Sequence, residues 1–549
     1  MRVIDFFCGG GGFSEGFRQA GFDVIWSVDN WQIAVNTHKE NHPDSISICD
    51  DVIRIAGLSD EEFENLVPDS EVIIGSPPCT SFSNSNNSGN ADKAIGIKLI
   101  EAYLRIIARK KNKEGSILKY WILENVPKAE PHIKKEYSAK DLGLDGDFIL
   151  RPKEGNSGVF NAKNFGVPSS RIRYFCGDFP MPKQIARDDS SLIPLKTILT
   201  ALGNPKEKLH RKITDPIYEL QLKGEDVSDH HYVQLLSDFE TTKLRRLKQD
   251  KGYMGKMSVP ENPEKPARTI MATMSFTSRE CFVLGHTNGK LRAPTIREVA
   301  TLMSFPIDYR FYGNSLGTKY RLVGNAVPPK MSFAFAKAMM KESNKNFRTK
   351  KYTPIQHGHE TEFINLNLNE IPIKKEKRKK ATARFKYHIP FFKFETYRVE
   401  LTNYHSDFDK LNFIWNAEIH YNQGKDKAKI YIPQLTNFEF NRPDLQKANK
   451  FINQIKNKIL SHNELQDVHC LTIKEIKKND LVGPYELLDI LRKFLNKEFN
   501  FQKDKKDQVL LSEPPNQLPR PIAIGYFILT CCINLMTISN GKNPKNKRA

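Results

Sequence analysis

Several features that define other protein classes are scarce or missing in this 549-residue chain. It has eight cysteines and no Cys-x-x-Cys pair, which predicts a reducing compartment, no disulfide framework and no metal site. A charged, glycine-rich segment opens the chain where a signal peptide would be apolar. The apolar stretch 522–538 is of borderline length for a membrane span, and Gly525, Thr530 and Asn534 interrupt it. We therefore expect a buried helix there and a protein of the cytoplasm without a membrane part.

Positive charge is what the chain has in excess. Its 84 Lys and Arg residues outnumber 64 Asp and Glu residues, which gives a net charge of +20 and a pI of about 9.3. Such a chain is drawn to a polyanion through salt-dependent phosphate contacts. Charge alone does not separate DNA from RNA or from an anionic membrane.

Residues 1–34 have the pattern of the first unit of a nucleotide-binding sheet. A strand at 3–7 leads into the run Gly9 to Gly12, and a helix follows from Ser14. A second strand ends at Asp29, where a carboxylate can accept a hydrogen bond from a ribose hydroxyl. The glycine run does not fit the pyrophosphate fingerprint G-x-G-x-x-G, so the ligand need not carry phosphates. The pattern favours a cofactor that contains adenosine.

A thiol and a carboxylate end two further predicted strands. Cys79 follows the apolar run 71–75 and two prolines that restrict the backbone, and Glu124 ends the apolar run 120–123. Either residue alone is more often a buried small side chain or a solvated charge. In an open α/β sheet both would lie at the carboxyl edge, where ligands bind. The pair therefore suggests covalent catalysis assisted by an acid.

These motifs, taken in order, resemble those of the cytosine-5 DNA methyltransferases. The resemblance covers roughly residues 1–345. It rests on DFFCGGGGFSEGF (5–17), Asp29, PPC (77–79), ENV (124–126), RIR (171–173) and GNAVP (324–328). It implies a Rossmann-like α/β sheet, S-adenosylmethionine as cofactor and methyl transfer to carbon 5 of a flipped cytosine.

The resemblance also implies roles for the catalytic residues. Cys79 would add to carbon 6 of the base, and Glu124 would hold or protonate ring nitrogen 3. Arg171 and Arg173 match the paired arginines of the family. The family usually has Gln two residues before the first arginine, whereas this chain has Ser169, which puts one detail of base flipping in doubt.

Cofactor contacts carry over from the family motifs residue by residue. The acid expected near the adenine amino group is Asp51, and Asp50 is an alternative. The full cofactor set that the resemblance implies is Phe7, Gly9, Gly11, Gly12, Asp29, Asn30, Asp51, Pro78, Leu99, Asn325, Ala326 and Val327.

The resemblance divides the chain into five parts. The expected parts are a catalytic core at 1–180, a target-recognition region at 181–285, a return to the core at 286–345, a basic linker at 346–386 and an accessory domain at 387–549. The loop after Cys79 and the recognition region would contact DNA through long polar and basic side chains. The expected DNA contacts are Ser83, Asn84, Ser85, Arg245, Arg246, Lys248 and Thr269.

Residues 387–549 lie beyond the resemblance and have the pattern of an α+β domain. Strands are expected at 397–402, 413–421 and 428–432, and helices at 448–460 and 485–499. An accessory DNA-binding or partner-docking module is the favoured interpretation. A nuclease fused to its protecting methyltransferase is an alternative, for which the loosely spaced metal-ligand candidates would be Asp407, Asp409, Glu418 and Lys429.

Three functions remain open from the sequence. The favoured one is a monomeric, sequence-specific DNA cytosine-5 methyltransferase of a prokaryotic restriction-modification system, acting on double-stranded DNA in the nucleoid beside a separately encoded endonuclease. A tRNA cytosine methyltransferase and a non-catalytic DNA-binding relative are the alternatives. The target sequence cannot be deduced, because base contacts depend on loop geometry.

Overall fold

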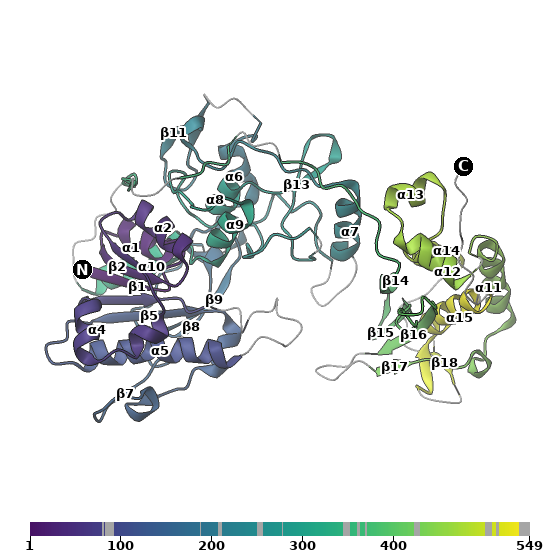
Figure 1. The fold of residues 1–549 in the computed structure, drawn as a ribbon, viewed down its shortest axis with the longest axis horizontal. Coiled ribbons are helices and arrows are strands. Elements are labelled where there is room, and N and C mark those ends of the chain that lie inside the picture. The colour runs from purple at the N-terminus through teal and green to yellow at the C-terminus, as the bar shows by residue number, and fades with distance from the viewer. Residues whose placement is uncertain are drawn as a thin grey trace. The chain divides into compact units, whose positions relative to one another are not determined.

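The computed structural model describes most of the chain and divides it into two compact units. The described residues are 1–78, 82, 93–186, 188–206, 211–249, 256–276, 278–343, 352–358, 363–367, 371–421, 429–459, 461–499, 508–511 and 515–536. Unit 1 comprises Met1–Leu236 and Val259–Ile373, and unit 2 comprises Ser237–Ser258 and Lys374–Ala549. Figure 1 labels their helices and strands.

A seven-stranded sheet in the order β3-β2-β1-β4-β5-β9-β8 organises unit 1. Strands β1 to β5 run parallel, and β9 and then β8 add to the β5 edge in antiparallel pairs. The strand order reverses between β1 and β4, which makes the carboxyl edge there the expected ligand position of a Rossmann-like fold. The strands are β1 (Arg2–Phe6), β2 (Asp23–Asp29), β3 (Ile46–Cys49), β4 (Val72–Gly75), β5 (Tyr120–Asn125), β8 (Gly158–Asn161) and β9 (Ile172–Asp178).

Helices cover both faces of this sheet because successive strand residues point to opposite sides. Val3 of β1 packs in the core beneath α1 (Gly12–Gln19) and α10 (Pro329–Glu342). Ile4 and Phe6 pack in the opposite core, beneath α3 (Val52–Ala56), α4 (Asp60–Leu66) and α5 (Lys93–Asn112). Figure 1 shows α4 and α5 on the other side of the sheet from α1.

The chain returns to the sheet through α10, which lies directly on α1. A Cβ atom on Gly16 would collide with Ser332, and the Ser332 hydroxyl donates to the Phe13 carbonyl at 2.9 Å. The glycine is therefore required by the close approach of the two helices. The other elements of unit 1 are α2 (Gln32–Asn41), α6 (Leu195–Leu202), α8 (Ile296–Leu302), α9 (Leu316–Asn325), β6 (Tyr137–Ser138), β7 (Ile149–Leu150), β10 (Lys212–Thr214), β11 (Gln221–Lys223), β12 (Leu284–Gly285) and β13 (Leu291–Arg292).

Part of the expected linker belongs to unit 1. The Asp308 carboxylate accepts from the Tyr352 hydroxyl at 2.8 Å and from the Ile355 amide at 2.9 Å. Further along, the Leu366 amide donates to Asp229 at 2.9 Å. Residues 352–358 and 363–367 are thus bound to the rest of unit 1 by buried or half-buried hydrogen bonds.

Unit 2 is an α+β domain built on a four-stranded antiparallel sheet in the order β14-β15-β16-β17. One face of the sheet packs against α14 and α15 in a continuous apolar core. Strand β15 coincides with the predicted strand 397–402, and the other predicted strands and helices overlap elements of the structure, so these predictions are confirmed. The elements are α7 (Asp238–Gln249), β14 (Lys386–Phe394), β15 (Tyr397–Thr402), β16 (Asn416–Tyr421), β17 (Lys429–Tyr431), α11 (Arg442–Ile455), α12 (His462–Cys470), α13 (Ile473–Lys478), α14 (Pro484–Glu498), β18 (Gln508–Leu510), β19 (Gln517–Pro519) and α15 (Arg520–Asn534).

Unit 2 includes two segments that the sequence analysis assigned to other parts of the chain. Helix α7 falls within the expected target-recognition region, and the basic tract 374–386 falls within the expected linker. The tract is anchored, because Arg378 pairs with Glu475 and the Lys379 ammonium donates to the His469 carbonyl at 2.6 Å. The apolar C-terminal stretch forms α15, which is buried in the core. Among the described helices, none has the length and apolar character needed to cross a bilayer.

Candidate active site

The sheet brings the sequence motifs of unit 1 to one edge. Phe6 of β1 pairs with Gly75 of β4, and Gly75 pairs with Leu123 of β5. Residues that follow these positions are therefore neighbours at the carboxyl edge, although 118 positions separate residues 6 and 124 in the sequence. Asp29 ends β2 on the other side of β1.

The turn after β1 has a backbone that few residues adopt. Phe7, Gly9 and Gly11 have φ angles of 59°, 52° and 81°, and Gly11 is the N-cap of α1. Phe7 is not a glycine, so its left-handed conformation is a strain of the kind that clusters at binding sites. Among the described residues, a Cβ atom on Gly9 would have only the Phe7 carbonyl nearby, at 3.9 Å, which leaves the backbone open to a ligand.

Asp29 closes the turn from the neighbouring strand. Its carboxylate accepts the Gly9 amide at 2.9 Å through Oδ2 and the Trp31 amide at 2.9 Å through Oδ1. Burial raises the pKa of Asp29, although these hydrogen bonds and the nearby Arg321 oppose the rise. Asn30 is exposed beside it. Asp29 is thus held in place by backbone amides of the turn and of the segment that follows β2.

Trp31 and Arg321 are two site neighbours that the sequence argument missed. Arg321 lies over the Trp31 ring, 4.8 Å from its centroid. Trp31 directly follows the Asp29 motif and offers a flat, half-buried aromatic surface next to the carboxylate. Its closeness in sequence to Asp29 was the available signal, whereas the Arg321 contact depends on the fold.

The two acids after β3 have different surroundings. Asp50 forms an ion pair with Arg54, which holds the pKa of Asp50 below its usual range. Asp51 is exposed, and its side chain caps α3 by accepting the Ile53 amide at 2.7 Å. Asp50 is therefore occupied by an arginine, and Asp51 remains the better placed of the two for a ligand.

The GNAVP motif lies against the glycine turn. A Cβ atom on Gly12 would collide with the Val327 carbonyl and approach Ala326 to 3.1 Å, so only glycine allows this packing. Asn325 ends α9 and is exposed, whereas Ala326 and Val327 are buried. The motif therefore completes the same edge from the far end of the unit.

The predicted nucleophile follows a loop that β5 holds in place. The side-chain Nδ2 of Asn125 donates to the Pro77 carbonyl at 3.0 Å, and the side-chain Oδ1 of Asn125 accepts the Val126 amide at 2.9 Å. Pro77 is buried and Pro78 is exposed. Leu99 is half-buried on α5. Four predicted site residues lie outside the described residues, namely Cys79, Ser83, Asn84 and Ser85.

Glu124 and Arg173 form an ion pair at the carboxyl edge of the sheet. The Arg173 Nε atom lies 3.1 Å from Glu124 Oε1, and the two side chains are 13% and 7% exposed. Burial raises the pKa of Glu124, while Arg173 and Arg171 oppose the rise. The carboxyl group is thus shielded from water and biased toward its protonated form, with a guanidinium on one oxygen.

The segment around Thr269 lies beside the arginine motif, although about 100 positions separate them. The Arg171 guanidinium donates to the Ile270 carbonyl at 3.2 Å, and the Thr269 hydroxyl donates to the Ser170 carbonyl at 2.7 Å. Ser169 is fully buried and pairs with Ala267, so its short side chain is enclosed by protein. Thr269 and Arg171 are therefore brought together.

The predicted DNA contact at Lys248 is wrong, and Arg246, another predicted contact, interacts with acidic residues of unit 2. Lys248 is fully buried because it shares a helical stripe of α7 with Glu240 and Leu244, at intervals of four residues. Arg246 lies 3.5 Å from both Glu486 and Asp489 and stacks over Tyr485 within unit 2. Arg245 is exposed, and its contact with DNA stays a prediction.

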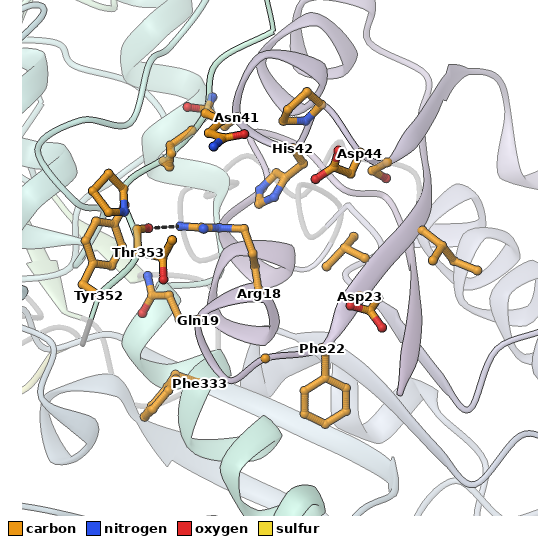
Figure 2. Close-up of a pocket in the computed structure, with 18 of the residues that line it drawn as sticks. Arg18, Gln19, Phe22, Asp23, Asn41, His42, Asp44, Phe333, Tyr352 and Thr353 are labelled. Carbon is orange, nitrogen blue, oxygen red and sulfur yellow. Dashed lines mark hydrogen bonds between the residues drawn. The ribbon is translucent and has the colours of Figure 1, made fainter. Parts of the chain in front are cut away.

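The cavity in Figure 2 is not this site. It has a volume of about 620 Å³ and lies at the amino end of β2, with Asp23, His42, Tyr352 and Arg18 among its lining residues. Arg18 donates to the Thr353 carbonyl there at 3.2 Å. The catalytic motifs lie at the carboxyl end of the strands, which is the opposite edge.

Comparison with known proteins identifies a family for the part of the chain that carries these motifs. The family model described as C-5 cytosine-specific DNA methylase matches residues 1–341. The chain therefore belongs to this family, and it is a DNA cytosine-5 methyltransferase.

Its relatives include named type II methyltransferases. It is similar to M.MthTI of Methanothermobacter thermautotrophicus, with 26% identity over 62% of this chain and 98% of that protein. M.FnuDI of Fusobacterium nucleatum is 27% identical over 64% of this chain and 97% of its own length. Among solved structures, the Dnmt2 methyltransferase of S. pombe covers 63% of this chain at 16% identity and a TM-score of 0.41.

Proposed function

We propose that the protein methylates carbon 5 of a flipped cytosine in double-stranded DNA through a covalent adduct with Cys79. The observation that supports this most is the meeting of three motifs at one edge. Asn125 of the ENV motif holds the loop two residues before Cys79, and Glu124 beside it pairs with Arg173 of the RIR motif. The proposal thus rests on described contacts around a nucleophile that the sequence supplies.

The reaction needs both a nucleophile and an acid because carbon 5 of cytosine is a weak nucleophile. The Cys79 thiolate would add to carbon 6, and the electron pair of the ring would move toward nitrogen 3 and carbon 5. Carbon 5 would then take the methyl group that S-adenosylmethionine supplies, with cleavage of the methyl–sulfur bond and release of S-adenosylhomocysteine. Loss of the carbon 5 proton to a base and expulsion of the thiolate give 5-methylcytosine and the free enzyme. An ordinary thiol has a pKa of about 8.5, so the site must favour the thiolate.

Glu124 would supply the proton that makes the addition possible. Its burial and raised pKa favour the carboxylic acid, which donates a hydrogen bond to ring nitrogen 3. Arg173 binds one oxygen of the same group and orients it. Arg171, anchored on Ile270, would lie near the pyrimidine carbonyl.

The residues at the glycine turn fit S-adenosylmethionine, which supplies an electrophilic methyl group. The open backbone at Gly9 allows close approach, Asp29 offers carboxylate oxygens to the ribose hydroxyls, and Trp31 offers an aromatic surface to the adenine. Asp51 would accept the adenine amino group. These are the interactions that a neutral adenosine requires, and none depends on a phosphate.

The relatives named as type II methyltransferases support a place in a restriction-modification system. The expected partner in such a system would be a separately encoded endonuclease. Within unit 1, the described residues of the expected region 181–285 would supply target recognition. Thr269 would lie close to the flipped base, because it is bonded to the segment that carries Arg171.

The test uses purified full-length protein with tritiated S-adenosylmethionine and separate pools of duplex DNA and tRNA. Wild type should label duplex DNA as 5-methylcytosine, identified by mass spectrometry, and Cys79→Ser should not. Label in tRNA alone would replace DNA by RNA as the substrate. Label in neither pool, with the cofactor still bound, would contradict the proposal and favour a non-catalytic role.

A further inference from the structure

A buried polar cluster lies on the sheet of unit 2, on the face opposite the apolar core. Glu400 of β15 and Glu418 of β16 are direct cross-strand partners, and His420 lies two residues beyond Glu418 on the same face. Their side chains are 8%, 4% and 4% exposed. Like charges placed directly opposite each other destabilise a sheet, so this pair requires a positive charge between its members.

The three side chains converge at the spacing of metal ligands. The His420 Nε2 atom lies 2.7 Å from an oxygen of Glu418 and 3.2 Å from an oxygen of Glu400. One potential ligand atom from each residue lies within 4.8 Å of the other two. Neighbouring ligands of an octahedral ion with bonds of about 2.1 Å are about 3 Å apart. The distances between the ligand atoms therefore match those between neighbouring ligands of one metal ion.

Further groups surround this triad. The Lys386 ammonium lies 2.9 Å from Glu418 and 3.8 Å from Glu400, and Arg398 donates to the other Glu400 oxygen at 2.5 Å. His405 approaches the second Glu418 oxygen at 2.8 Å from a side chain that is 49% exposed. The cluster is thus reachable from solvent through His405.

The same contacts could form a closed salt-bridge network, and the burial of the groups favours an exchangeable cation instead. Lys386 is 29% exposed on a flexible stem and has a strongly hydrated ammonium, so it can swing into solvent. The side chains of Glu400, Glu418 and His420, in contrast, are at most 8% exposed.

We propose that Glu400, Glu418 and His420 bind one divalent cation of the Mn²⁺ or Mg²⁺ class, whose position Lys386 takes in the metal-free protein. Two carboxylates select hard cations, and the imidazole makes Mn²⁺ the better fit of the two. Three protein ligands leave positions for water or for another oxygen ligand. The site is independent of methyl transfer and lies in the domain whose role the sequence left open.

Three of the metal-ligand candidates taken from the sequence are not part of this triad. These are Asp407, Asp409 and Lys429, whereas Glu418 is the candidate that the triad includes. The proposal therefore departs from the sequence analysis, which predicted no metal site.

The test measures Mn²⁺ binding to the full-length protein by electron paramagnetic resonance of the free ion. Wild type should bind one equivalent and show a higher thermal unfolding temperature with Mn²⁺. Glu418→Gln keeps the shape of the side chain and should weaken binding at least tenfold. Glu439→Gln removes an exposed carboxylate of the same unit and should leave binding unchanged.

A second variant separates the two interpretations of the cluster, even if Glu418→Gln folds poorly. Lys386→Met removes the competing ammonium and should tighten Mn²⁺ binding, whereas a closed network predicts no gain. The proposal is overturned if folded wild type binds no Mn²⁺ at millimolar concentration. Equal binding by wild type and folded Glu418→Gln would overturn it as well.

Discussion

Removal of the Asn125 amide should slow catalysis without weakening cofactor binding. Asn125 is fully buried and bridges the Pro77 carbonyl and the Val126 amide. Alanine would leave both of those groups without this partner, and a stranded buried polar group costs about 1–3 kcal/mol. For the two groups together we expect the free energy of unfolding to fall by about 2–6 kcal/mol, against a total of about 5–15 kcal/mol for an ordinary domain.

The effect on rate follows from the position of Pro77, two residues before Cys79. A misplacement worth about 1.4 kcal/mol in the transition state lowers kcat tenfold, so Asn125→Ala should lose at least that factor. The cofactor contacts at Asp29 and the glycine turn do not involve Asn125. The Kd for S-adenosylmethionine, measured by calorimetry, should therefore stay within about twofold of wild type.

A matched control is Asn41→Ala, which also removes a buried asparagine. The Asn41 side chain bonds the Thr37 and Arg310 carbonyls, at the end of α2 that lies far from Asp29 along the helix. It should lower stability by a similar amount and leave kcat nearly unchanged. If Asn125→Ala has normal kcat, or if both variants lose kcat equally, the positioning role is refuted.

Three further predictions concern charged groups of unit 1. Asp29→Asn should weaken S-adenosylmethionine binding at least tenfold in calorimetry, because a carboxylate acceptor is lost. Burial raises the pKa of Asp5 from 3.8 to about 8, so between these pH values the native state holds a proton that the unfolded chain loses. The free energy of unfolding, measured by urea titration, should therefore fall as pH rises from about 4 to 8. Asp5→Asn should remove that decline. Lys319 and Asp229 form a fully buried ion pair, and Lys319→Met should lower the free energy of unfolding by about 3–5 kcal/mol, with partial recovery when Asp229→Asn is added. A flat pH profile for wild type, or no recovery in the double variant, would contradict the last two expectations.

The sequence predicted which strand ends meet at the carboxyl edge because its signals are local. Glycines in a left-handed turn, an acid at a strand end and prolines after an apolar run each constrain the backbone where they stand. The parallel sheet then brings strand ends together without further information. The positions of Gly9, Asp29 and Glu124 at the carboxyl edge therefore follow from local patterns in the sequence.

Other features depend on partners that sequence spacing does not reveal. Lys248 was taken for a DNA contact because it is basic, yet the stripe that it shares with Leu244 is buried. The bond from Asn125 to Pro77 and the triad at Glu400 arise only when distant strands pair. Composition could not separate a buried lysine from an exposed one, since both carry the same charge in the sequence.

The most direct test of the central claim is a covalent trap. Full-length protein would be incubated with S-adenosylmethionine and random-sequence duplex DNA in which 5-fluorocytosine replaces cytosine. Because fluorine at carbon 5 cannot leave as a proton does, the adduct should persist on a denaturing gel. Wild type should give a protein–DNA species whose mass spectrum places the linkage at Cys79, and Cys79→Ser should give none. Absence of the species in wild type that methylates ordinary DNA, or linkage at another residue, would contradict the account.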